Sequence, residues 1–191
     1  MNKSRLEAFS DGVIAILITI LVLELKIPQN PTLSALIPMF PVFLTYILSF
    51  IYVGIYWNNH HHMFHAATHI NGKIMWANLH LLFWLSLIPF MTGWMGENHF
   101  EPVPTAFYGG VLMMSAFAYW ILQNTIITSE GHSSKLAQAV GSDWKGRLSP
   151  ILYLIAIGLA FVSHWLSQAL YVFVAMIWLI PDRRIEKSIS G

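Results

Sequence analysis

Histidines are the residues of this chain whose types and spacing most obviously allow chemistry, because five of them stand between positions 60 and 69. His61, His65 and His69 are spaced four residues apart, which would place them on one face of a helix. Imidazoles on one face can bind zinc or copper. No carboxylate or thiolate stands nearby to complete a ligand set. We therefore favour a polar helix end at a membrane surface, with a metal site at His61, His65 and His69 as the alternative.

No other group of residues has the composition of a catalytic site. The sequence has no glycine-rich phosphate loop and no HExxH motif, and it pairs no carboxylates with a base inside an apolar segment. Basic residues interleaved with aromatic ones, as nucleic-acid binding requires, are also missing. We expect neither an enzyme nor a nucleic-acid-binding protein, and we expect no cofactor.

The first apolar segment, RLEAFSDGVIAILITILVLEL at 5–25, holds the remaining candidates. Arg5, Ser10 and Asp11 stand near its start, and charged groups inside a membrane segment are costly and usually either functional or buried. On a helix, an aliphatic stripe with one hydroxyl points well away from Ser10 and Asp11. The stripe consists of Gly12, Ile16, Thr19, Ile20, Leu23 and Ile27. Periodicity alone is explained by ordinary helix packing and does not indicate a pore.

The elements that position these residues are predicted to be membrane helices. Of the 191 residues 56% are hydrophobic and only 10% are charged, whereas a soluble domain carries about 25% charged residues. The run from Leu148 to Ile180 would be about 50 Å long as one helix, too long for one crossing, and Ser163, His164 and Gln168 divide it. We expect one all-α membrane domain, 1–191, with spans at 6–25, 37–57, 74–94, 103–127, 148–162 and 164–180. A short amphipathic piece is expected at 135–140.

Basic residues predict how these six spans are oriented. With six spans, both termini lie on one side of the membrane, which then receives all Lys and Arg residues except one, Lys26. Basic residues concentrate on the cytoplasmic side of membrane proteins, so both termini are expected to be cytoplasmic. The nine residues on that side are Lys3, Arg5, Lys73, Lys135, Lys145, Arg147, Arg183, Arg184 and Lys187.

Three stretches resemble a known family. The segment 5–25 is similar to the signature of the transmembrane protein 175 family in its prokaryotic form, whose members are relatives of the lysosomal potassium channel. Its core pattern, Arg-x-x-x-Phe-Ser-Asp, corresponds here to Arg5, Phe9, Ser10 and Asp11, followed by an aliphatic run with a threonine. YWNNHHHMF at 56–64 and LLFWLSLIPFMTGWMGEN at 81–98 also resemble the family. The triple histidine is a departure, since a basic residue often stands where His62 does.

The resemblance implies a potassium channel that is weakly selective over sodium. It would be a homotetramer in the plasma membrane of a prokaryote, in contact with lipid and passing potassium ions through a central pore lined by the first helix. The family's pore positions correspond to Ile16 as the main constriction, Thr19 as a hydroxyl ring, Ile20 and Leu23. The family's structural network corresponds to Arg5, Phe9, Ser10, Asp11, Trp57 and His60. A hydrophobic gate would replace the TVGYG filter of most potassium channels, which FYGG at 107–110 does not reproduce.

Two other functions remain open at the level of the sequence. One is a metal-ion or proton transporter that uses the cluster His60–His69. The other is a membrane scaffold without transport, in which the first helix only packs in an oligomer.

Overall fold

Helices make up the secondary structure of the described part of the chain, which comprises residues 2–131, 133–141 and 143–179 of a computed structural model. No strand occurs among these residues, which confirms the predicted all-α class. In chain order the elements are α1 (Lys3–Leu23), the 3₁₀ helix η1 (Leu33–Met39), α2 (Phe40–Ala66), α3 (Gly72–Ser86), α4 (Ile88–Glu97), α5 (Pro102–Glu130), α6 (Lys135–Val140), α7 (Trp144–Ala160) and α8 (His164–Leu179).

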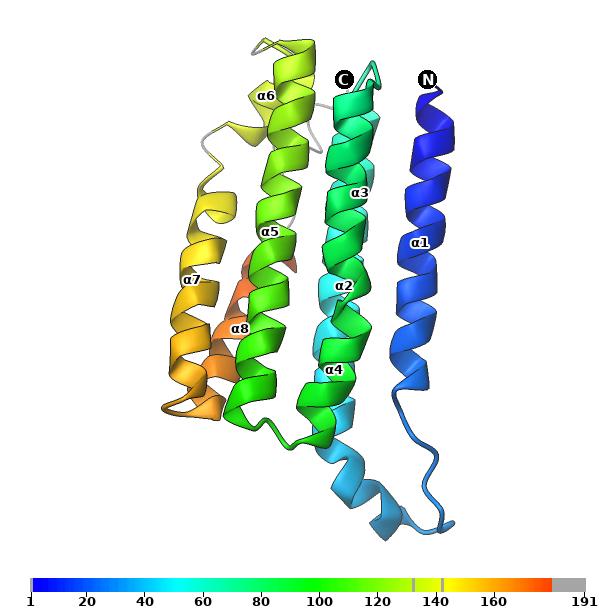
Figure 1. Cartoon of the computed structure of the whole chain (residues 1–191), viewed down its shortest axis with the longest axis vertical. Coiled ribbons are helices and arrows are strands. Elements are labelled where there is room, and N and C mark those ends of the chain that lie inside the picture. The colour runs from blue at the N-terminus through cyan, green and yellow to red at the C-terminus, as the bar shows by residue number, and fades with distance from the viewer. Residues whose placement is uncertain (1, 132, 142, 180–191) are drawn as a thin grey trace.

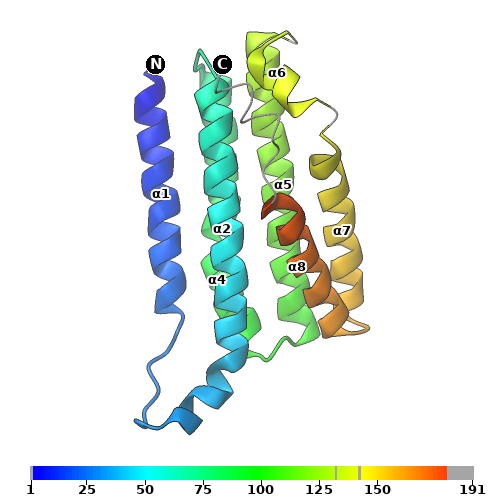
Figure 2. The same cartoon turned by 180° about the vertical axis from the view of Figure 1, so that it is seen from behind.

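The long helices stand side by side as one bundle, with α1 at one edge and α7 at the opposite edge (Figures 1 and 2). α1 packs against α2, α3 and α4, whereas α5 connects this group to α7 and α8. At the end where α1 begins lie the loop 67–71 and α6. The linker 24–32, η1 and the turn 161–163 lie at the other end. The edge position of α1 leaves one of its sides without a neighbour from its own chain.

Four helical segments are long and apolar enough to cross a membrane: Lys3–Leu23, Leu33–Ala66, Gly72–Glu97 and Pro102–Glu130. α8 is apolar but has only 16 residues. The predicted division of the last apolar run is present, because α7 ends at Ala160 and α8 begins at His164. Gln168, expected to belong to that break, lies inside α8 instead. Residues 180–191, which include Arg183, Arg184 and Lys187, lie outside the described part of the chain.

Two helices differ from their predicted bounds for physical reasons. The membrane span expected at 37–57 is part of a longer helical segment, since α2 continues through the polar stretch NNHHHMFHA to Ala66. The span expected at 74–94 is divided into α3 and α4 at Leu87. Pro89 stands in the first turn of α4, where its missing N–H removes no helical hydrogen bond. The proline thus starts a second helix at the place where the first one ends.

Polar side chains fix the helix ends. Asn2 caps α1 by accepting from Ser4 N, and Asn71 caps α3 by accepting from Ile74 N at 3.0 Å. At the far end of the bundle, Lys26 Nζ and Glu97 Oε1 form an ion pair at 2.6 Å, which ties the linker after α1 to the end of α4. The hydrogen bond and negative charge of Glu97 raise the pKa of Lys26. The ion pair therefore attaches the linker that follows α1 to the rest of the bundle.

Candidate functional site

One face of α1 is anchored to the bundle. Its buried residues recur every three or four positions, which is the spacing of one helical face. They are Leu6, Ser10, Ile14, Leu17 and Leu21, and each is at most 6% exposed. This face packs against α2, α3 and α4.

The opposite face of α1 carries the stripe predicted from the sequence. Ile16 is 57% exposed, Ile20 36% and Leu23 76%, and Gly12 and Thr19 are exposed as well. The stripe is therefore not used for packing within the chain. Ile27 differs from the prediction, because α1 ends at Leu23 and Ile27 lies in the linker.

The hydroxyl of Thr19 has a defined orientation. Its Oγ1 donates to Ile16 O at 2.7 Å, one turn back along the same helix. Since the hydroxyl proton is used by the backbone, the lone pairs of Oγ1 remain free on the exposed side. Thr19 thus offers an oxygen ligand on the otherwise aliphatic stripe.

Ser10, Asp11, Trp57 and His60, four of the six residues expected to form a network, have polar contacts between helices. Trp57 Nε1 donates to Asp11 Oδ1 at 3.1 Å, which joins α2 to α1 directly. His60 and Ser10 are joined through a third residue, Asn78 of α3. Asn78 Nδ2 donates to Ser10 Oγ at 2.9 Å, and Asn78 Oδ1 accepts from His60 Nε2 at 2.7 Å.

Asn78 is the residue of this network that the sequence did not identify. It is fully buried, as is Ser10, and His60 is 1% exposed. An asparagine in the middle of an apolar segment signals a buried polar contact. Nothing in its spacing shows which helices it joins, because its partners are 18 and 68 residues away.

Arg5 and Phe9 take no part in this network within the chain. Both side chains are exposed, and Arg5 forms no ion pair or hydrogen bond with the part of the chain that is described. Arg5 and Asp11, two charged residues of opposite sign near the start of α1, therefore form no ion pair within one chain. The helix places the two residues about 120° apart, because they are six positions apart. Instead, Arg5, Phe9 and Leu79 line an open groove of about 430 Å³ between α1 and α3.

The beginning of α1 is held by the loop 67–71. Lys3 Nζ donates to Ala67 O at 2.8 Å and to His65 O at 3.2 Å. The same loop is held by Glu130 at the end of α5, whose Oε1 accepts from Thr68 Oγ1 at 2.9 Å and from the Thr68 backbone N–H. Two charged side chains thus connect the ends of α1, α2 and α5.

The histidines do not form the three-residue face that their spacing allowed. Since α2 ends at Ala66, His69 lies in the loop, where its Nδ1 is 2.7 Å from Thr68 Oγ1. His61 and His65 remain on the helix with ring centres 6.4 Å apart. Across the described residues, no group of three histidine, aspartate or glutamate side chains is placed to hold a metal ion.

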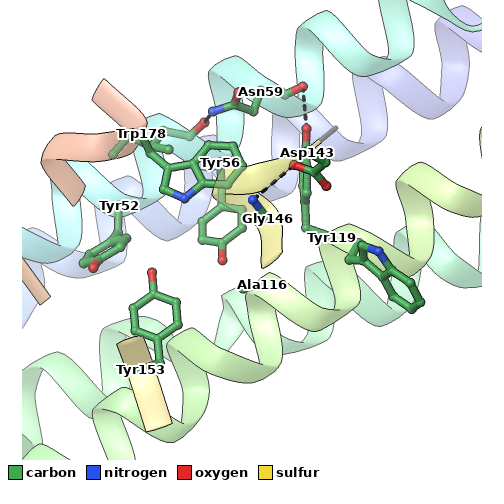
Figure 3. Close-up of a pocket in the computed structure, with 11 residues that line it drawn as sticks. Tyr52, Tyr56, Asn59, Ala116, Tyr119, Asp143, Gly146, Tyr153 and Trp178 are labelled. Carbon is green, nitrogen blue, oxygen red and sulfur yellow. Dashed lines mark hydrogen bonds between the residues drawn. The ribbon is translucent and has the colours of Figure 1, made fainter. Parts of the chain in front are cut away.

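A small internal cavity lies between α2, α5, α7 and α8, away from α1 (Figure 3). Its volume is about 30 Å³, and the rings of Tyr52, Tyr56, Tyr119 and Tyr153 line it. Asp143 closes one end, where its Oδ1 accepts from Gly146 N at 3.1 Å. A cavity of this size is too small for an organic ligand. The stripe on α1 therefore remains the candidate site.

Comparisons with known proteins show which proteins this chain is similar to. The family model described as "Endosomal/lysosomal potassium channel TMEM175" matches residues 5–89, which include α1 from Arg5 onward and all of α2 and α3. A protein named a potassium channel from Chryseobacterium sp. (strain P1-3) is 57% identical over 190 residues, which is 100% of this chain and 99% of that protein. Another protein named a potassium channel, from Chamaesiphon minutus, is 32% identical and is covered over 92% of both chains.

The fold has a counterpart among solved structures. The crystal structure of a lysosomal potassium-selective channel TMEM175 homolog from Chamaesiphon minutus matches with a TM-score of 0.83 and 31% sequence identity. The match covers 94% of this chain and 97% of that one. The similarity thus extends over nearly the full length of both chains, in sequence and in fold. This chain belongs to the TMEM175 family.

Proposed function

We propose that this chain is the subunit of a homotetrameric potassium channel in which α1 of each subunit lines a central pore. The observation that supports this most directly is the division of α1 into an anchored face and an uncovered aliphatic stripe, at the edge of the bundle. Relatives that match almost the whole chain are named potassium channels. Four copies arranged around one axis would enclose the stripe without disturbing the anchored face.

The proposed membrane topology has six spans, with both termini in the cytoplasm and the protein in the plasma membrane of a prokaryote. In support, α7 and α8 form a hairpin alongside the four longer segments. Lys3, Arg5 and Lys73 belong to the end of the bundle where α1 begins, whereas Lys26 lies at the other end. This distribution follows the rule that basic residues concentrate on the cytoplasmic side.

In the proposed mechanism, four Ile16 side chains form the narrowest part of the pore. A narrow apolar neck can close by excluding water. A cation that passes the open neck must give up part of its hydration shell, and potassium holds its water less tightly than sodium. The Thr19 oxygen, one turn away, replaces part of the lost hydration. This arrangement predicts a modest preference for potassium, without a filter of backbone carbonyls.

The basic test is ion flux through the purified full-length protein in liposomes with a potassium gradient. We expect potassium flux that exceeds sodium flux and that is absent from protein-free liposomes. If no flux occurs at any voltage or pH, the chain acts as a scaffold. If flux depends on His61 and His65, the transporter alternative replaces the channel.

Substituting Ile16→Asn tests the constriction itself. An amide at the neck binds water and prevents dewetting, so the current should rise several-fold and the potassium preference should fall. Reversal potentials with potassium on one side and sodium on the other measure the preference. The matched control is Val22→Asn, since Val22 is also exposed on α1 but lies about 120° around the helix from Ile16. Equal behaviour of the two variants would show that Ile16 is not the constriction.

A further inference from the structure

A second open site lies on the bundle, separate from the stripe on α1. It is a groove of about 880 Å³ between the beginning of α3 and the last turns of α5, at the end of the bundle where α1 starts. Its volume is in the range of small-ligand sites. No residue of α1 lines it.

The groove changes from polar to aromatic along its length. Lys73 and Thr128 lie nearest the ends of their helices, whereas Trp76 and Trp120 lie deeper along the bundle. Thr128 and Trp120 are eight residues apart on α5, which corresponds to about 12 Å along the helix. Trp76 is 75% exposed and Trp120 44%, and Phe117 stacks on Trp120 with ring centres 5.8 Å apart. Large aromatic side chains are thus left open directly below a polar rim.

Some polar side chains of the groove are already hydrogen-bonded within the chain, and others are not. Both polar atoms of the Asn71 side chain are hydrogen-bonded, since its Oδ1 caps α3 and its Nδ2 donates to Ser129 Oγ at 2.8 Å. Asn124 Nδ2 donates to Trp120 O at 2.8 Å within α5. The Lys73 ammonium and the Thr128 hydroxyl have no partner among the described residues.

The nearby acidic side chain does not neutralise Lys73. Glu130 directs its carboxylate to Thr68 and to the backbone N–H of His69 in the loop 67–71. The groove therefore presents one uncompensated positive charge and one free hydroxyl above an apolar aromatic wall. This pattern matches an amphiphile with a negative head and a hydrocarbon tail, and tryptophans typically lie at the depth where headgroups meet acyl chains.

We propose that this groove binds an anionic phospholipid of the leaflet on the side of the termini. The phosphate accepts from Lys73 Nζ and Thr128 Oγ1, and an acyl chain lies against Trp76 and Trp120. The choice of leaflet rests on the membrane topology proposed above. The occupant is a lipid rather than a second copy of the chain, because the open side is charged at the rim and aromatic below it, in the order of a membrane leaflet.

The test is native mass spectrometry of the full-length protein in detergent with an equimolar mixture of phosphatidylglycerol and phosphatidylethanolamine. The wild type should retain phosphatidylglycerol preferentially. Lys73→Gln should reduce this retention roughly fivefold, the effect of one lysine near an anionic lipid, whereas Lys73→Arg should keep it. Arg147→Gln is the matched control, since Arg147 is an exposed basic residue on another helix and should leave retention unchanged. Trp120→Ala should also reduce retention, because it removes the acyl contact.

Three results would overturn the proposal. One is equal retention by the wild type and Lys73→Gln, and another is equal retention of both lipids by the wild type. The third is a change from tetramer to smaller species in Lys73→Gln and Trp120→Ala with lipid retention unchanged, which would assign the groove to contact between subunits. Lipid retention is measured independently of ion flux. A chain that binds the lipid but does not conduct ions would therefore refute the proposed channel function without refuting the proposed lipid site.

Discussion

Asn78 joins α1 to α2 although it belongs to neither helix. Its amide nitrogen donates to Ser10 of α1 and its amide oxygen accepts from His60 of α2. All three side chains are buried, where an unsatisfied polar atom costs far more than the net value of one hydrogen bond. The network therefore contributes to stability mainly because every member has its partner.

Replacing Asn78 by Ala leaves buried His60 Nε2 without its partner and removes the bond that Ser10 Oγ accepts, although Ser10 Oγ still donates to Leu6 O at 2.9 Å. We expect the free energy of unfolding to fall by about 1–3 kcal/mol, the cost of one buried polar group left unsatisfied. Thermal unfolding of the detergent-solubilised protein, followed by gel filtration, measures the change. Asn98→Ala is the control, since Asn98 is exposed and bonds only to Trp94 O of its own helix. If both variants unfold at the same temperature, the network does not stabilise the bundle.

Thr19 is expected to affect selectivity rather than folding. Thr19→Val keeps the shape of the side chain but removes the oxygen, so the preference for potassium over sodium should fall a few-fold in reversal-potential measurements. Thr19→Ser keeps the oxygen and should behave as the wild type. Because the side chain is exposed and bonds only to its own helix, neither change should alter the thermal stability. An unchanged preference in Thr19→Val would exclude the hydroxyl from the ion path.

At the scale of single residues, the sequence indicated the members of the network on α1 and α2 but not Asn78 of α3, which lies between them. The family resemblance gave Asp11 and Trp57 as members of one network, and in the structure Trp57 Nε1 lies 3.1 Å from Asp11 Oδ1. Asn78 was not identified, because the residues that it joins are 18 and 68 positions away in the chain. The place of Arg5 could not be derived either, since its side chain lies on the face that the chain leaves open.

Among the helices, α2 and α4 approach each other closely at Gly96. A Cβ at this position would lie 2.9 Å from Val42 Cα and 2.6 Å from Thr45 Oγ1. The first of these atoms belongs to the backbone and cannot move aside without shifting α2. Gly96 therefore allows the close contact between the two helices, as small residues do in membrane bundles.

Gly96→Ala should force the two helices apart and lower the thermal stability. The matched control is Gly54→Ala on α2, where a Cβ would meet nothing within 4 Å. That change should be neutral or stabilising by up to about 1 kcal/mol, because alanine is the better helix former. The difference between the two melting temperatures measures the close contact. Equal melting temperatures would mean that α4 can move away from α2 without a loss of thermal stability.

The helices themselves were largely predictable, and their ends were less so. Hydropathy identifies apolar stretches, so it ended the second membrane span at Trp57, whereas the helix that contains this span continues up to Ala66. The division between α3 and α4 at Leu87 was missed for the opposite reason, because Pro89 interrupts the backbone and leaves the hydropathy unchanged. The short helix expected at 135–140 is present as α6.

At the scale of the whole molecule, α1 is exposed on the side that carries its aliphatic stripe. Within one chain, exposed aliphatic residues over the length of a helix indicate a contact with other molecules. In a membrane, these residues contact either lipid or other subunits. The proposed tetramer differs from a lipid-covered monomer in one measurable property, which is the distance between the α1 helices of neighbouring subunits.

Cross-linking through a single cysteine measures that distance, and the chain is suited to it because it contains no cysteine of its own. In the proposed tetramer, Leu23 of each subunit faces the central axis, so Leu23→Cys should form covalent dimers under mild oxidation. Val162→Cys is the control, since Val162 is 79% exposed in the turn between α7 and α8, far from α1. Because a disulfide requires Cα atoms within about 7 Å, random collisions in the membrane contribute little. Dimers formed equally by both variants, or by neither, would argue against a pore lined by α1.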